Sequence, residues 1–193
     1  MKVSDAWSAD ELLIRARAGE ASAFAALVRR YQRTVYSIAL RMLSDRHRAE
    51  DLAQEVFLQL YRSLATIGSD AHLAFWLRKV AVNRAIDRMR QESRYDGEPL
   101  TEAAAIVEQV GEDDPLLQRR MAELVAQLPP AARAVVVLRY QEDLDPLDIA
   151  STLDMPINTV KSHLKRSLTL LRARVLGAAI VDDVQPSMSE PSR

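Results

Sequence analysis

The chain has 193 residues, which suits one or two small domains, and 48% of them are hydrophobic, enough for a packed core. It contains no cysteine, which excludes a disulfide framework, a thiolate zinc site and a thiol nucleophile. The three histidines are far apart and show no metal-ligand spacing, so neither a metal nor a cofactor is expected.

The net charge of -1 is unevenly distributed along the chain. Residues 1–92 contain 15 Lys and Arg against 11 Asp and Glu, and residues 119–175 contain 9 against 6, so both segments are basic. Residues 93–118 contain 1 against 7 and are acidic. Because phosphate contacts supply most non-specific DNA affinity, two basic segments separated by an acidic one predict only weak DNA binding by the chain alone. Ordinary fluctuation of charge along the chain is the alternative.

Residues 10–92 are predicted to be helical almost throughout, because hydrophobic residues recur at intervals of three and four and proline is absent. A first long helix is expected to bury apolar side chains from residue 24 to residue 42. A second helix is expected over about residues 48–64 and a third over about residues 73–91. Turn-forming residues at 68–70 predict a loop between the second and third helices.

The second helix is predicted to offer an interaction surface on the face opposite its hydrophobic stripe. Acidic side chains there surround an exposed leucine, a pattern that suits a basic partner helix with an apolar ridge. The residues of this strip are Asp51, Gln54, Glu55, Leu58 and Arg62. A merely solvated helix face remains the alternative.

The third helix is predicted to carry a basic strip beside a tryptophan and a loop. This combination can hold an unpaired DNA strand and stack or enclose a base. The candidate residues are Trp76, Arg78, Lys79, Asn83, Arg84 and Arg88. A place for Trp76 in the hydrophobic core is the open alternative.

The helical pattern fails in residues 93–118, which are predicted to form a flexible acidic linker. Helicity then resumes, and a pair of prolines restarts it in the way that proline suits a first helical turn. The tail, residues 177–193, is expected to be disordered. The predicted fold is therefore all-α, with two small helical domains, residues 1–92 and 119–176, joined by the linker.

Within the second domain, the segment 146–175 has the pattern of a helix-turn-helix. A short helix is expected first, then a turn at residues 154–156, and then a second helix that begins near Thr159. Asp154 and Asn158 are residue types that tolerate left-handed backbone, and Asn158 or Thr159 can cap the second helix.

The outer face of that second helix offers short polar and basic side chains that can contact bases or phosphates. They are Asn158, Thr159, Lys161, Ser162, His163, Lys165 and Arg166. This is the chemistry of a DNA recognition helix, and a solvated basic face on a plain helical hairpin is the alternative.

Three stretches of the chain, residues 49–62, 76–90 and 128–172, resemble the extracytoplasmic function (ECF) group of bacterial RNA polymerase sigma factors. The resemblance extends over about residues 10–175. It implies a factor that binds core RNA polymerase, on the beta-prime clamp helices and the beta subunit, and directs promoter recognition, promoter melting and transcription initiation. An anti-sigma factor is a further partner that the family implies.

The resemblance also implies a role for each candidate surface. The strip on the second helix would bind the polymerase, and the third helix, with the loop around residues 66–75, would open and read the minus-ten element of the promoter. The helix-turn-helix would read the minus-thirty-five element. The chain has Asp154 and Asn158 where family members usually have glycine, and His163 where arginine is frequent, which bears on its base preference.

The five glycines are scattered and form no phosphate-binding loop, so no enzyme activity and no small-molecule substrate are expected. No apolar run is long enough to span a bilayer and no signal peptide is evident, so a cytoplasmic location without membrane insertion is expected. The alternative function is a stand-alone helix-turn-helix regulator with an N-terminal sensing or dimerisation domain. Such a regulator would bind its operator tightly without polymerase.

Overall fold

The computed structural model describes residues 7–95 and 115–182, and within these two ranges the regular elements are all helical. The all-α prediction is therefore confirmed. In chain order the elements are α1 (Ala9–Arg17), α2 (Ala21–Leu43), α3 (Arg46–Ser63), the 3-10 helix η2 (Leu64–Thr66), α4 (Asp70–Tyr95), α5 (Pro115–Ala126), α6 (Pro130–Tyr140), α7 (Pro146–Leu153) and α8 (Ile157–Asp182).

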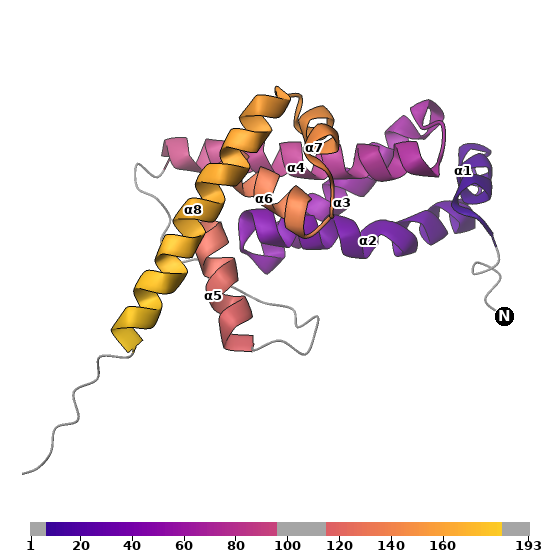
Figure 1. Cartoon of the computed structure of the whole chain (residues 1–193). Coiled ribbons are helices and arrows are strands. Elements are labelled where there is room, and N and C mark those ends of the chain that lie inside the picture. The colour runs from indigo at the N-terminus through magenta and orange to yellow at the C-terminus, as the bar shows by residue number, and fades with distance from the viewer. Residues whose placement is uncertain (1–6, 96–114, 183–193) are drawn as a thin grey trace, which may run out of the picture.

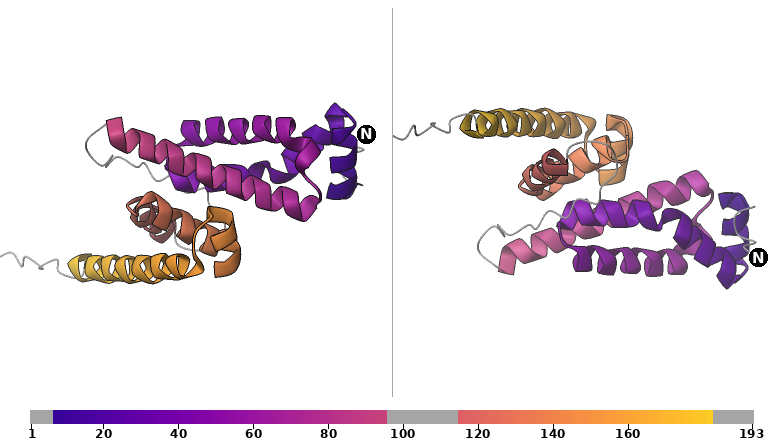
Figure 2. Two further views of the ribbon diagram at one scale, coloured as in Figure 1. Left: turned by 90° about the horizontal axis from the view of Figure 1, so that it is seen from above. Right: turned by 90° about the horizontal axis from the view of Figure 1, so that it is seen from below.

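The helices are arranged in two layers that lie side by side (Figures 1 and 2). Helices α2, α3 and α4 run roughly along one another as a bundle, and α1 lies across the end of this bundle where α3 passes into α4. Helices α5 to α8 form the second layer, in which α6 and α7 pack against α4. The N-terminal and C-terminal halves are thus in direct contact.

Side-chain caps fix where several helices begin. At α1, Ser8 and Glu11 form a capping box: the Ser8 backbone N–H donates to the Glu11 carboxylate at 2.8 Å, and the Glu11 N–H donates to Ser8 Oγ at 3.3 Å. The hydrogen bonds from the backbone and hydroxyl of Ser8 lower the pKa of Glu11. Asp45 accepts a bond from a backbone amide of the first turn of α3, and Asp145 accepts two from α7.

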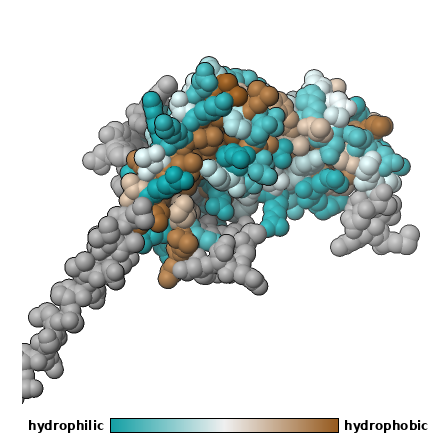
Figure 3. Space-filling view, in the orientation of Figure 1, coloured by the Kyte–Doolittle hydropathy of each residue, from teal (hydrophilic) through white to brown (hydrophobic). Residues whose placement is uncertain are grey.

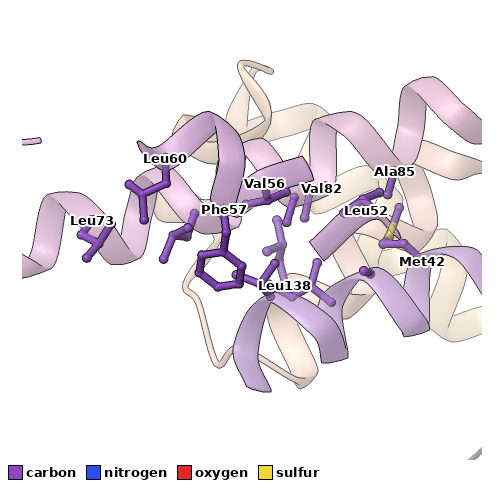
Figure 4. Packing of buried hydrophobic residues seen from close by; sticks show 14 of the residues in the cluster. Met42, Leu52, Val56, Phe57, Leu60, Leu73, Val82, Ala85 and Leu138 are labelled. Atoms are coloured by element: carbon purple, nitrogen blue, oxygen red, sulfur yellow. The ribbon is translucent and has the colours of Figure 1, made fainter. Parts of the chain in front are cut away.

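A single hydrophobic cluster joins the two halves of the chain. Leu52 and Val56 of α3 and Val82 and Ala85 of α4 belong to it, and so does Leu138 of α6, which is fully buried (Figure 4). A smaller cluster, formed by Leu128, Ala132, Val136 and Leu171, lies wholly within the C-terminal half. Moving the halves apart would therefore expose apolar side chains of both.

The structure differs from the sequence-based expectation at several helix ends. Gly19 adopts a left-handed conformation, with φ of 89°, between α1 and α2, and this break within residues 10–92 was not predicted. Helix α4 runs over Asp70–Tyr95, longer than expected at both ends, and α8 continues to Asp182, beyond residue 176. The predicted linker falls mostly, and the remaining tail wholly, outside the described residues, and the domain boundaries stay predictions.

Candidate protein and nucleic-acid interfaces

The strip of α3 that was predicted to bind a protein is turned to solvent. The hydrophobic residues of α3 face the core, which leaves the opposite face open. Leu58 is 52% exposed, Asp51, Gln54 and Arg62 are exposed, and Glu55 is half-buried. We call these five residues the docking strip. An exposed leucine between acidic and amide side chains suits a partner that is both apolar and basic.

Glu55 links the docking strip to the basic face of α4. Its two carboxylate oxygens form ion pairs with Arg84 Nη1, at 2.9 Å, and Arg88 Nη2, at 2.7 Å. The Arg84 guanidinium also donates twice to Gln59 Oε1, at 2.9 and 2.7 Å, and Arg88 Nη1 donates to the backbone carbonyl of Arg48 at 3.1 Å. These two arginines were predicted to contact DNA, and the structure gives them intramolecular partners that fix α4 against α3.

The first two cations of α4 reach across to the C-terminal half. Arg78 Nε donates to Glu142 at 2.9 Å, and the Glu142 side chain is only 8% exposed. Lys79 Nζ contacts Asp154 at 2.7 Å and lies 5.9 Å from the centre of the Phe75 ring. Both cations were predicted to contact minus-ten DNA, and in this arrangement of the halves both are paired with acids.

The other two candidates on α4 are partly covered. Trp76 is half-buried and packs against the main hydrophobic cluster, as the core alternative expected. Asn83 is half-buried as well. A direct role of either residue in DNA contact stays a prediction.

The helix-turn-helix has the predicted helices and turn. Helix α7 ends at Leu153, and Asp154 then adopts the left-handed conformation, with φ of 50°. The cap prediction for α8 was wrong, however. The helix begins at Ile157, so Asn158 and Thr159 lie inside its first turn, and the Pro156 carbonyl accepts the backbone N–H of Thr159 at 2.8 Å.

The predicted recognition face of α8 is open to solvent. Six of its seven candidates are exposed, and His163 is half-buried. An open hollow runs along the same helix and is lined by Ser162, Lys165, Arg166, Thr169, Leu170 and Ala173. Hydrophilic residues cover much of the face that α8 crosses, with hydrophobic ones between them (Figure 3). This surface is accessible although the two halves are in contact.

A buried arginine between the halves was missed by the sequence reasoning. Arg133 of α6 is 7% exposed, and its Nη1 donates to the backbone carbonyl of Met42, at the end of α2, at 2.6 Å. Burial, and secondarily the positive charge of Arg48, lowers the pKa of Arg133 to about 10. Nearby, Gln141 Nε2 donates to Ser37 Oγ at 2.6 Å. The signal that could have found Arg133 is its position among apolar residues in the first half of α6, whose other charged residue, Arg139, is in the last turn.

Each half of the chain matches a known protein family. Residues 27–95 match the family model of sigma-70 region 2, and residues 118–171 match that of sigma-70 region 4. These matches place the chain among RNA polymerase sigma factors. In the described residues, no helix is both long and apolar enough to cross a membrane.

Individual relatives specify the group. The chain is 31% identical over 170 residues to the ECF RNA polymerase sigma factor SigW of Bacillus subtilis, covering 81% of this chain and 91% of the relative. It is 29% identical to the RNA polymerase sigma-H factor of Pseudomonas aeruginosa, covering 81% and 88%. The chain belongs to the ECF family of RNA polymerase sigma factors. It is therefore a transcription initiation factor that binds RNA polymerase and recognises promoters, and the stand-alone regulator is not favoured.

Two solved structures share the fold. The sigma factor RpoE of Bartonella quintana, in complex with the anti-sigma factor NepR, superposes with a TM-score of 0.66 at 21% identity, covering 80% of this chain and 96% of that one. CnrH, in complex with the cytosolic domain of CnrY, gives a TM-score of 0.62 at 21% identity, covering 92% and 100%.

Proposed function

We propose that the docking strip of α3 binds core RNA polymerase, that α4 and the loop before it open and read the minus-ten element, and that α8 reads the minus-thirty-five element. The observation that carries the proposal is the exposure of the docking strip, with Leu58 at its centre, on the helix that is ion-paired to α4. A protein that binds this strip is thereby connected to the helix next to the melted DNA.

The proposed partners are the beta-prime clamp helices and the beta subunit of the polymerase, and promoter DNA. We also propose an anti-sigma protein as a partner, because one of the two structural neighbours is a sigma factor in complex with an anti-sigma factor. The site of action would be the cytoplasm, where the polymerase works. The chain itself would catalyse no reaction: extruding a base costs a few kcal/mol, which contacts to the separated strand offset.

DNA binding by the first cations of α4 requires a change in their partners. Arg78 and Lys79 are paired with Glu142 and Asp154 of the other half, and both pairs would open when the halves separate along the promoter. Phosphates can then replace the carboxylates as partners of the same cations. The docking strip and the recognition face of α8 need no such change, since both are exposed.

The test is run-off transcription with purified core polymerase over a promoter library, together with binding of the labelled chain to the core. D51K should abolish core binding and transcripts from every template, whereas D148K, a charge reversal at an exposed residue of α7, should leave core binding unchanged. K161A and R166A should weaken only the dependence on the upstream element. A neutral D51K would refute the docking assignment, and tight promoter binding without polymerase would favour the stand-alone regulator.

A further inference from the structure

The loop between α3 and α4 is held in its middle by one buried residue. Ile67 is fully buried, while the residues on either side of it, Ala65 and Thr66 before it and Gly68 and Ser69 after it, are exposed. Those exposed residues are the part of the loop that a flipped base could meet. Their positions depend on how the two ends of the loop are fixed.

Both ends of this loop are hydrogen-bonded to α1. At the first end, Arg17 Nε donates to the backbone carbonyl of Leu64 at 3.2 Å, across 47 residues of sequence. At the second end, the backbone N–H of Asp70 donates to Asp10 Oδ1 at 2.7 Å, across 60 residues. Helix α1 lies across this end of the bundle (Figures 1 and 2), so one short helix contacts both sides of the loop.

The position of α1 is itself well determined. Leu12, Leu13 and Ala16 are buried against the bundle, and the capping box at Ser8 fixes the start of the helix. The second end of the loop has additional support from Tyr31 of α2, whose hydroxyl donates to Asp70 Oδ1. The bonds from α1 therefore attach the loop to a helix that is packed against the bundle.

In both bonds one partner is a charged side chain. The Asp70 N–H is in the first turn of α4, where backbone groups lack partners within their own helix, whereas the Leu64 carbonyl also accepts the Ile67 N–H at 3.3 Å. A charged side chain bonds each of these two backbone groups, and the Asp10 carboxylate also interacts favourably with the positive end of the α4 dipole.

We infer that Asp10 and Arg17 are positioning residues for base recognition: by fixing both ends of the loop, they hold its exposed residues in the one geometry that accepts the flipped base. This inference rests on the proposed function, in which the loop reads the minus-ten element. Its physical basis is preorganisation: a loop that is ordered before binding discriminates between bases without first losing conformational entropy.

The experiment uses full-length chain in complex with core polymerase, with D10A and R17A as the main variants. Open-complex formation is measured by permanganate reactivity of unpaired thymines on the best promoter and on promoters with single minus-ten substitutions. We expect both variants to bind core polymerase as the unmodified chain does, but to lose on the order of tenfold in the ratio between correct and substituted promoters, as the loss of one charged hydrogen bond implies.

Two further variants separate positioning from a general loss of structure. R15A, on the same helix, removes contacts to Glu20 and Trp7 but none to the loop, and should keep the full ratio. D10N retains an oxygen that can accept the Asp70 amide and should rescue discrimination. A D10N protein as impaired as D10A would contradict the inference, and so would unchanged ratios in both D10A and R17A.

A promoter with a preformed minus-ten bubble distinguishes the remaining outcomes. D10A and R17A should initiate from it at close to the unmodified rate, because its bases are already unpaired and their capture by the loop is no longer needed to open the duplex. Equal losses on bubble and duplex templates would indicate a folding defect and overturn the inference. If the unmodified chain itself failed to open any promoter with core polymerase, the proposed function would be wrong, which is a different result from failure of the α1 variants alone.

Discussion

Replacing the buried Arg133 tests what holds the two halves together. The guanidinium donates one hydrogen bond to the Met42 carbonyl, which contributes about 1.5–3 kcal/mol for a charged donor. Against this stands the cost of burying the charge. A pKa lowered from the usual 12.5 to about 10 corresponds to about 3 kcal/mol, and that cost is fully present at neutral pH because the folded-state pKa is still far above 7.

These two contributions nearly cancel, so the shape of the side chain should matter more than its charge. We expect R133M, which keeps the apolar stem, to change the free energy of unfolding by within about 1 kcal/mol. R133A also leaves a cavity and should lose about 2–4 kcal/mol. Urea unfolding of the full chain, followed by far-ultraviolet circular dichroism, measures both values. Equal losses in the two variants would refute this reasoning and show that the hydrogen bond dominates.

Three further variants address the pairs on and around α4. Glu55→Ala removes both ion pairs to the arginines of α4 and should lower stability by about 1–3 kcal/mol in urea unfolding, besides weakening core binding. Asp154→Asn removes the charge that pairs with Lys79 but keeps a residue type that tolerates left-handed backbone, so less than about 1 kcal/mol should be lost. Tyr31→Phe removes the bond to Asp70 and a titrating group. Burial and this bond raise the pKa of Tyr31 to about 12. The stabilisation that comes from the protonated hydroxyl is therefore complete below pH 10 and lost by about pH 12. Y31F should lack this part of the pH dependence of the free energy of unfolding.

Local signals predicted the helix-turn-helix well. Asp145 caps α7, a proline follows it in the first turn, and Asp154 takes the left-handed position after Leu153, so nearly all the determinants lie within ten residues of sequence. The start of α8 was predicted two residues late because Asn and Thr are frequent cap residues. In the structure the Pro156 carbonyl accepts the first backbone hydrogen bond of the helix, from the Thr159 N–H. Periodicity likewise predicted the buried face of each long helix.

Contacts across long stretches of sequence could not be predicted in the same way. Arg133 and Met42 are 91 residues apart, and nothing local indicates that the end of α2 needs a donor from α6. The same holds for Arg84, whose neighbours in sequence suggest an outward basic strip. Only the packing of α3 on α4 shows that Glu55 lies within reach of its guanidinium.

The hydrophobic cluster shared by the halves has a consequence for assembly on a promoter. Val135 and Leu138 of α6 are fully buried in the cluster that both halves share, and α6 packs on α2 and α4. Each Å² of apolar surface that is exposed to water when the halves separate costs about 25 cal/mol. A polymerase that holds the two halves apart along DNA must therefore supply apolar surface of its own to cover the side chains that separation exposes. Either half produced alone should aggregate in solution, and co-expression with core RNA polymerase should keep it soluble.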